Sequence, residues 1–455
     1  MIATSATDIA SAMGGEVIAG DPALTATTVS TDTRTLEPGA CWVALRGERF
    51  DANDFAANAI AAGAGIVVVE RWDGPPPSGA TVIRVDDGLL GLQRLAHWHR
   101  SRLDLHVVGI TGSNGKTSTK DFTRAVLAAH FETLATRGNL NNHIGVPLTV
   151  LGVGAEHRAA VIEMGMNHPG EIAPLCKIAR PRAGIITNIG TAHIEHLGSR
   201  EAIAEEKGAL ARSLPEDGAL FVPAGCDFAN YFKSRTKARV ISVGNGRGLV
   251  RAENLTQDGV ASRFTLVIED RPVGEVSLPV IGRHMVKNAL LAAGAGWFFG
   301  VPVEKIVAGL SASAVTSGRL RRFEQDGITV FDDTYNANPE SMAAAIDTLG
   351  DVPVGPGGKR HIVMGRMGEL GIHAAEAHLA AGRLARSRGL EVMVVGPGAE
   401  GMAEGAGGAP HLLTADDAAA ALRAVLKPGD VVLFKASRSA ALELVMNRVF
   451  PPAQN

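Results

Sequence analysis

The spacing of apolar positions predicts buried strands that alternate with helices along most of the chain. Apolar runs such as HVVGI, AAVIE and AGIIT each lead into a glycine-rich or polar turn, and helical stretches follow. Short buried strands that alternate with helices are typical of a mainly parallel sheet with helices on both faces. We therefore predict an α/β fold.

Three regimes of this pattern predict three domains, a number that fits 455 residues. Residues 1–98 mix short β-branched runs with helical stretches and predict a small α/β unit. Residues 99–313 predict a central parallel sheet, with an antiparallel excursion near residues 251–282, where short runs such as RFTLVIED alternate. Residues 314–455 return to the strand-and-helix pattern and predict a second doubly wound domain.

Composition narrows the class of protein. The 44 basic and 47 acidic residues give a net charge of −3, which predicts no broad cationic face for nucleic acid. Cys41, Cys176 and Cys226 lie far apart without CxxC spacing, which argues against disulfides or a zinc site. The start lacks the pattern of a signal peptide, and the apolar stretch 289–303 is too short to span a bilayer. We expect a cytoplasmic enzyme without membrane insertion.

The strongest local signal is a glycine-rich turn between the strand HVVGI and a helix. Its residues are Thr111, Gly112, Ser113, Asn114, Gly115, Lys116, Thr117 and Ser118. Backbone N–H groups and the helix N-terminus favour phosphate, Lys116 is placed to reach the terminal phosphates, and Thr117 is placed to ligate magnesium. Ile110 stands where the usual motif has its first glycine, so the loop is a variant. We predict a nucleoside triphosphate site, with a turn that binds nothing as the alternative.

Two other strand ends carry candidate ligands. Glu163 ends the run AAVIE, and His193 follows the next buried strand. Because the carboxyl ends of parallel strands meet at one sheet edge, we expect both side chains near the phosphate loop. Glu163 suits magnesium, and His193 suits a second metal or the γ-phosphate. A helix-capping carboxylate and a structural histidine are the alternatives.

Eight segments, in order along the chain, resemble the Mur ligases of peptidoglycan synthesis. They are TGSNGKT, GNLNNHIGVP, VIEMGMNHPGEI, NIGTAHIEHLGS, GRHMVKNALLAA, SGRLRRFE, DDTYNANPESM and KASRSAALE. The resemblance implies a UDP-binding first domain, a central ATP-binding domain and a Rossmann-like third domain. It also implies that ATP and Mg²⁺ drive amide-bond formation through an acyl phosphate.

Within this family, the forms STDTR, FDANDF, NLNNHIG and DDTYNANP are most similar to one member. That resemblance implies UDP-N-acetylmuramoyl-tripeptide and D-alanyl-D-alanine as substrates, and UDP-N-acetylmuramoyl-pentapeptide, ADP and phosphate as products. A ligase that adds a single amino acid, a folylpolyglutamate synthase and an ATP-hydrolysing switch protein are the alternatives. None of these functions requires more than one copy of the chain, so we expect a monomer.

The same resemblance assigns roles around ATP. Lys116, His193 and Lys207 are implied to be catalytic, and Thr117, Glu163, His193 and Lys207 to hold metal, with Lys207 as a carbamate bridging to magnesium. The nucleotide is implied to meet residues 112–118, Asn288 with His284 nearby, Arg322, Asp333 and Tyr335. An exposed helix lysine, a helix cap and a core aromatic are the alternatives for Lys207, Asn288 and Tyr335. Because these contacts are divided between the second and third domains, we expect domain closure.

Substrate contacts are also assigned by resemblance. The first domain contributes Ser30, Thr31, Asp32, Thr33 and Arg34, continued by Gly47, Arg49, Asp51, Asn53 and Asp54, with a surface turn as the alternative for the second set. The tripeptide path is implied to include Asn139, Asn141, Asn142 and His143, and the third domain to contribute Asn336, Asn338, Lys435, Ser437, Arg438 and Ser439. Ala436 stands where the family pattern has glycine, which predicts an altered backbone there.

Overall fold

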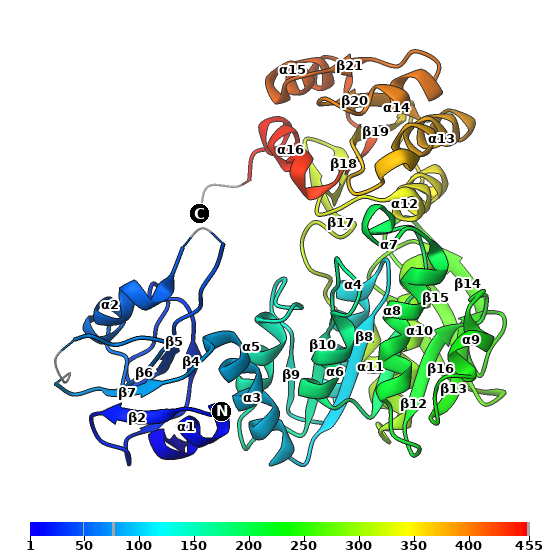
Figure 1. Cartoon of the computed structure of the whole chain (residues 1–455). Coiled ribbons are helices and arrows are strands. Elements are labelled where there is room, and N and C mark those ends of the chain that lie inside the picture. Colours follow the sequence, from blue (N-terminus) through cyan, green and yellow to red (C-terminus); the bar gives the residue numbers. More distant parts are fainter. Residues whose placement is uncertain (49, 75–77, 453–455) are drawn as a thin grey trace.

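The computed structural model describes residues 1–48, 50–74 and 78–452, in which the strands form three large sheets and one two-stranded sheet. Each large sheet carries helices, as Figure 1 shows from the blue amino-terminal end to the red carboxyl-terminal end. The predicted α/β class is therefore confirmed. Arg49 of the assigned substrate set lies outside the described residues.

The first sheet belongs to the amino-terminal part of the chain. In sheet order its strands are β2 (Glu16–Ala19), β7 (Thr81–Arg84), β6 (Ile66–Val69), β5 (Cys41–Val43) and β4 (Val29–Ser30). All neighbours are parallel except β2 and β7, and β1 (Thr4–Ser5) pairs separately with β3 (Thr25–Ala26). The helical segments are α1 (Ala6–Met13), η1 (Ala52–Phe55), α2 (Ala56–Ala61) and α3 (Gly88–Ser101).

Helix α3 connects the first sheet to the second. It packs against α1 on one side and against α5 (Gly145–Leu151) and α6 (Ile172–Ala179) on the other. The predicted boundary at residue 98 therefore falls within a helix, near its carboxyl end. Buried apolar side chains of both parts form one continuous cluster around α3.

The central sheet has nine strands, parallel over most of its width and antiparallel at one edge. In sheet order they are β16 (Arg271–Leu278), β15 (Ser262–Ile268), β14 (Val250–Gln257), β13 (Arg239–Asn245), β12 (Ala219–Pro223), β11 (Ala183–Ile186), β8 (His106–Thr111), β10 (Ala159–Glu163) and β9 (Thr133–Ala135). Strands β9 to β14 are parallel, whereas β14, β15 and β16 pair antiparallel. This confirms the excursion expected near residues 251–282.

Helices cover the central sheet because its parallel strands are apolar on both faces. Strands β8 and β10 are almost entirely buried, as parallel strands between helix layers are expected to be. The other helices here are α4 (Lys116–Ala128), α7 (Ile194–Leu197), α8 (Arg200–Ser213), α9 (Ala229–Lys233), α10 (Arg283–Phe298) and α11 (Val303–Ser311). Residues 288–296 of α10 are buried without interruption, so this helix is a core element and not an amphipathic one.

The third sheet has six strands, of which five are parallel. In sheet order they are β17 (Arg321–Gln325), β18 (Ile328–Asp333), β22 (Val431–Lys435), β19 (Arg360–Gly365), β20 (Glu391–Val395) and β21 (His411–Leu412), and β17 runs antiparallel to β18. The helical segments are α12 (Pro339–Asp351), η2 (Gly371–His373), α13 (Ala374–Ser387), α14 (Glu400–Gly405), α15 (Ala415–Val425), η3 (Arg438–Ala440) and α16 (Glu443–Val449).

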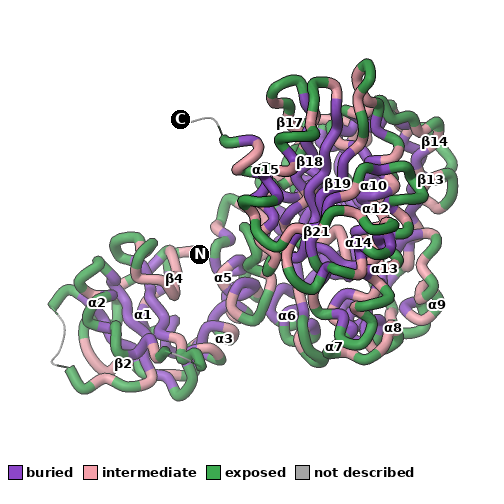
Figure 2. Tube along the Cα trace, turned by 90° about the horizontal axis from the view of Figure 1, so that it is seen from above, coloured by how far each residue is buried: buried purple, intermediate pink, exposed green. Residues whose placement is uncertain are grey.

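The second and third sheets share a packed boundary. One cluster of buried apolar side chains extends from α4 and α10 to α12 and the third sheet. Figure 2 shows buried segments throughout these two parts, with the amino-terminal part standing to one side. In the described residues, no helix is both long and apolar enough to cross a membrane.

Candidate active site

The phosphate loop joins the end of β8 to the start of α4. Gly115 precedes the helix with φ 76°, a left-handed conformation that glycine adopts without strain. A Cβ at this position would also lie 2.7 Å from Asn288 Nδ2. By helix geometry, the first-turn N–H groups of α4 lack intrahelical partners and are therefore available to an anion.

The sequence predicts that successive N–H groups of the loop face the phosphate. Two of these backbone amides instead donate to the segment after β11. Ser113 N donates to Asn188 O at 3.1 Å, and Asn114 N donates to Asn188 Oδ1 at 2.8 Å. Gly190 N donates to Ser113 Oγ at 2.9 Å. The segment after β11 thus holds the loop from behind, and the phosphate-facing donors are left to the helix N-terminus.

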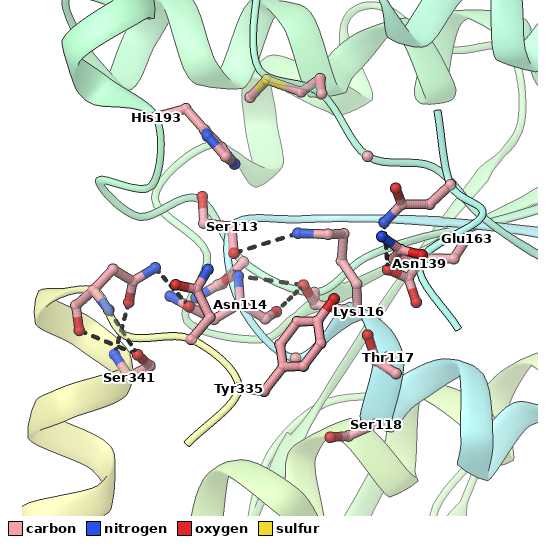
Figure 3. A pocket seen from close by; sticks show the side chains of 18 of the residues that line it. Ser113, Asn114, Lys116, Thr117, Ser118, Asn139, Glu163, His193, Tyr335 and Ser341 are labelled. Atoms are coloured by element: carbon pink, nitrogen blue, oxygen red, sulfur yellow. Dashed lines mark hydrogen bonds between the residues drawn. The ribbon is translucent and has the colours of Figure 1, made fainter. Parts of the chain in front are cut away.

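Lys116 is folded against the loop. Its Nζ donates to Gly112 O at 2.8 Å, and Ser113 O lies at 3.5 Å (Figure 3). Burial lowers the pKa of Lys116, and the nearby carboxylate of Glu163 partly opposes that effect. A phosphate oxygen at this position would offer the ammonium a charged acceptor.

Glu163 lies where β10 ends, in register with Ile110 of β8. Its side chain is only 2% exposed, and Oε1 accepts a hydrogen bond from Asn141 Nδ2 at 2.8 Å. The other oxygen, Oε2, is buried without a hydrogen-bond partner among the described residues. A buried carboxylate oxygen is costly unless a cation or donor meets it, so this site fits a hard cation such as Mg²⁺.

Thr117 supplies a second oxygen at the start of α4. Its Oγ1 accepts a hydrogen bond from Arg319 Nη2 at 3.0 Å. Within residues 1–48, 50–74 and 78–452, no three His, Cys, Asp or Glu side chains converge as a metal centre. A magnesium ion here would therefore need phosphate oxygens or water to complete its shell.

His193 and Lys207 occupy different surroundings. His193 lines the cavity, and its Nδ1 lies 2.7 Å from Glu369 Oε2 of the third domain. Lys207 on α8 is 1% exposed and is not among the described residues that line the cavity. Burial, reinforced by Lys116, holds the pKa of Lys207 well below its ordinary value. This increases the fraction of neutral amine, which is the form that reacts with carbon dioxide.

A cavity of about 820 Å³ brings most of the assigned nucleotide residues together. The central domain contributes Ser113, Asn114, Gly115, Lys116, Thr117, Ser118, Asn139, Asn141, Asn142, His143, Glu163, His193, His284 and Asn288. The third domain contributes Asp333, Tyr335, Asn336, Asn338 and Lys435. Gly112 is not part of the lining, but its carbonyl oxygen accepts the hydrogen bond from Lys116 Nζ. Burial and the nearby Lys435 and Lys287 lower the pKa of His284 to about 4.

The third domain approaches the phosphate loop through the segment after β18. Asn338 caps α12 and also donates from Nδ2 to Asn114 Oδ1 at 2.6 Å. In Figure 3, Tyr335 lies beside Lys116 and Thr117. Lys435 Nζ donates to Asp333 Oδ2 at 2.6 Å and to Asn336 O at 2.9 Å, so these residues brace the segment. Burial raises the pKa of Asp333, and Lys435 opposes that effect.

The arginine assignment differs between sequence and structure. Arg319 lines the cavity, and its guanidinium lies 4.0 Å from the ring centroid of Tyr335. Arg322 lies outside the cavity lining and pairs with Glu324. Arg319 lies two residues before β17 begins, whereas Arg322 lies on that strand and pairs with a residue of the same strand. The structure therefore brings Arg319 and not Arg322 to the cavity, and the nucleotide contact of Arg322 stays a prediction.

The assigned first-domain residues are remote from this cavity. Ser30 Oγ accepts from Asp32 N at 3.1 Å, and Arg34 Nη2 donates to Asp32 Oδ2 at 2.7 Å. The hydrogen bond from Arg34 lowers the pKa of Asp32 to about 2. The structure places Thr31 and Thr33 in this same short turn, outside the cavity lining.

The second first-domain set forms a braced surface turn. Asp51 and Asp54 pair with Arg71, and Asn53 Oδ1 accepts from Glu70 N at 2.7 Å. Gly47 N donates to Phe50 O at 2.9 Å. These contacts show how the turn is held and leave its substrate role a prediction.

The carboxyl-terminal set after β22 also lies outside the cavity lining. Ser437 Oγ and Ser439 Oγ are 3.3 Å apart, and Arg438 Nη1 donates to Glu443 Oε1 at 2.8 Å. Ala436 is buried and has no positive φ. Alanine therefore fits this backbone without left-handed strain, and the altered backbone expected from the exchange of glycine stays a prediction.

Three family models and a named relative match this chain along most of its length. Residues 25–97 match the model of the "Mur ligase family, catalytic domain", residues 110–296 the "Mur ligase middle domain" and residues 318–438 the "Mur ligase, glutamate ligase domain". UDP-N-acetylmuramoyl-tripeptide–D-alanyl-D-alanine ligase of Escherichia coli is 37% identical, covering 98% of each chain.

Solved structures give the same picture. The crystal structure of MurF from Acinetobacter baumannii matches with a TM-score of 0.90 and 34% identity, covering 98% of each chain. MurF ligase of Thermotoga maritima, solved in complex with ADP, matches with a TM-score of 0.82 and 28% identity, covering 93% of this chain and 96% of that one.

Proposed function

The chain belongs to the Mur ligase family, and we propose on that premise that it joins D-alanyl-D-alanine to UDP-N-acetylmuramoyl-tripeptide at the expense of ATP. The products are UDP-N-acetylmuramoyl-pentapeptide, ADP and phosphate. The observation that carries the proposal is the shared cavity, which unites the phosphate loop, Asn288 and the Asp333–Asn338 segment between two domains. The chain is a ligase that uses ATP in peptidoglycan synthesis.

The reaction has two balanced steps. An oxygen of the tripeptide's terminal carboxylate attacks the γ-phosphorus, the bond to the β-phosphate oxygen breaks, and ADP leaves. The amine nitrogen of the dipeptide then attacks the carbonyl carbon of the acyl phosphate, loses a proton and expels phosphate. A carboxylate and a triphosphate repel each other, so fixed cations and dipoles at the phosphate are the main requirement of the first step.

The residues of the cavity meet that requirement. Lys116 and the N-terminus of α4 stabilise the charge that builds on the transferring phosphate. Bound Mg²⁺ would supply further charge neutralisation between the β- and γ-phosphates, held by Thr117 and Glu163. Asn288 presents donor and acceptor atoms to the adenine, and Arg319 with Tyr335 covers the nucleotide from the third domain.

Further assignments extend the proposal. His193 would meet the γ-phosphate or hold a second metal ion, and Lys207, as a carbamate, would supply an anionic oxygen to magnesium. Asn139 and Asn142 line the tripeptide path, Ser30, Asp32 and Arg34 bind the UDP moiety, and Ser437 and Arg438 meet the dipeptide. Lys435 holds Asn336 and Asp333 in place for that contact. One chain supplies the described lining of the cavity, so a monomer suffices, and we place the enzyme in the cytoplasm.

The test is phosphate release with ATP, Mg²⁺, UDP-N-acetylmuramoyl-tripeptide and D-alanyl-D-alanine, with each component omitted in turn. We expect release only with all four, and a product of pentapeptide mass. Release with a single amino acid in place of the dipeptide would identify a different Mur ligase, and turnover of a folate would identify a folylpolyglutamate synthase. Release with ATP alone would support the switch protein instead.

A further inference from the structure

The loop that carries His193 is held by two carboxylates from the other domain. Glu340, in the first turn of α12, accepts hydrogen bonds on Oε1 from Thr191 N at 2.8 Å and from Thr191 Oγ1 at 3.0 Å. Glu369, in the segment after β19, places Oε2 2.7 Å from His193 Nδ1. The third domain therefore contacts both ends of the Thr191–His193 segment.

The approach of Glu340 depends on the absence of a side chain at Gly190. A Cβ added at Gly190 would lie 2.8 Å from Glu340 Cδ, a distance that real side chains do not adopt. The other oxygen of Glu340, Oε2, is buried without a hydrogen-bond partner among the described residues. The carboxylate is thus inserted closely against the backbone of the loop.

The contact with Glu369 joins two residues in an uncommon backbone conformation. His193 has φ 64° and Glu369 has φ 59°, both in the left-handed region. Such conformations persist in residues other than glycine when surrounding contacts hold them. Helix α7, which follows His193, packs against η2, which follows Glu369, so the contact lies within a wider domain boundary.

The same loop also supports the phosphate site. Gly190 N donates to Ser113 Oγ at 2.9 Å, and Asn188 accepts from two amides of the phosphate loop. A shift of the segment from Asn188 to His193 would therefore move the phosphate loop and the histidine together. This links the docking of the third domain to the geometry of the ATP site.

We propose that Glu340 and Glu369 are positioning residues that set the Thr191–His193 segment, so that His193 takes its working position when the third domain docks. The 2.7 Å contact between Glu369 Oε2 and Nδ1 sets the position of the imidazole. Glu340 fixes the backbone two residues earlier. The inference rests on the proposed function, because it concerns how that same site is assembled.

The first test is a double-mutant cycle between Glu369 and His193. We expect Glu369→Ala to lower kcat by roughly 10- to 100-fold, the effect seen for residues that orient a ligand, with KM for the three substrates nearly unchanged. Glu369→Gln, which keeps an oxygen acceptor, should recover part of this loss. In a His193→Ala background, Glu369→Ala should change kcat by less than about twofold.

The matched control is Glu376→Ala on α13, where the side chain is 76% exposed and the nearest ion-pair atom, Arg383 Nη1, is 3.8 Å away. This variant should keep wild-type kcat and Tm. For Glu340, the Ala variant should lower kcat and the Gln variant should retain most of it, because Gln keeps an acceptor for Thr191. Equal Tm values across the set show that folding is intact. Where an Ala variant has a lowered Tm, kcat of the Gln variant at that position tests the positioning role instead.

The outcomes separate this inference from the proposed function. If the wild-type enzyme does not make pentapeptide, the proposed function fails. If the wild type makes pentapeptide but Glu369→Ala keeps full kcat, or lowers it equally with and without His193, the positioning role is overturned. A loss of kcat from Glu369→Ala that disappears in the His193→Ala background supports the positioning role.

Discussion

The phosphate loop and the Ser30–Arg34 turn are both prominent in the sequence, yet they are constructed in opposite ways. In the loop, Lys116 is half-buried and donates to backbone carbonyls, and Glu163 is 2% exposed. In the turn, the Arg34 side chain is 85% exposed and bonds only to Asp32 two residues away. This difference fits the proposed roles, because a site that stabilises charge during the reaction needs groups placed in advance, whereas a turn proposed to bind the UDP moiety has its side chain free to meet it.

The largest effect is expected from Lys116. We expect Lys116→Ala to lower kcat by roughly 10²- to 10³-fold, because the ammonium stabilises the charge on the transferring phosphate and alanine supplies no charge there. The measurement is the initial rate of phosphate release with all substrates present, with Tm as the check on folding. Wild-type turnover in this variant would contradict the role of the loop.

Glu163 comes next. Glu163→Gln keeps the shape and the oxygen that accepts from Asn141 but removes the charge, so we expect a loss of about 10- to 100-fold at fixed Mg²⁺. The loss should be partly offset at high Mg²⁺, and EDTA should abolish turnover of the wild type. Titration of the rate with Mg²⁺ tests this, and an unchanged midpoint would mean that Glu163 does not hold the metal.

The two arginines give a direct comparison within the third domain. We expect Arg319→Ala to reduce kcat/KM for ATP by about tenfold, since it loses a hydrogen bond to Thr117 and the contact with Tyr335. Arg322→Ala should stay within about twofold, because its partner is the exposed Glu324. The reverse order would restore the sequence assignment of Arg322.

The smallest effect on kcat is expected in the exposed turn. Arg34→Ala should raise KM for the UDP substrate by up to about tenfold while kcat stays constant, the sign of lost uniform binding. Its Tm should not change, because so exposed an ion pair adds little to stability. Arg263→Ala, which removes another exposed pair, is the control and should alter neither parameter. Loss of kcat in Arg34→Ala would show that the turn takes part in the chemistry.

Local signals account for what the sequence predicts well. The strand, glycine turn and helix around residues 106–128 are contiguous. The positions of Glu163 at the end of β10 and of His193 in the segment after β11 follow from the parallel sheet. Apolar alternation also predicts the antiparallel strands near residues 251–282. These features depend on neighbours in the sequence or on a general rule of sheet geometry.

The residues that the sequence does not predict are brought to the site by long-range contacts. SGRLRRFE offers three arginines within four residues, and only the start of β17 decides which one enters the cavity. Asn188, Glu340 and Glu369 meet the site from distant segments, and no spacing rule connects them to residues 112–118. Glu340 contacts Thr191 across 149 positions, so the signal that could find it is tertiary.

The most direct test of the account follows an oxygen atom from substrate to phosphate. The tripeptide is labelled with ¹⁸O in its terminal carboxylate, the ligation is run with ATP and D-alanyl-D-alanine, and the released phosphate is analysed by mass. The acyl-phosphate route predicts one ¹⁸O in each phosphate, because the attacking carboxylate oxygen leaves with it. Pentapeptide formed with unlabelled phosphate would contradict transfer of the γ-phosphate to the carboxylate.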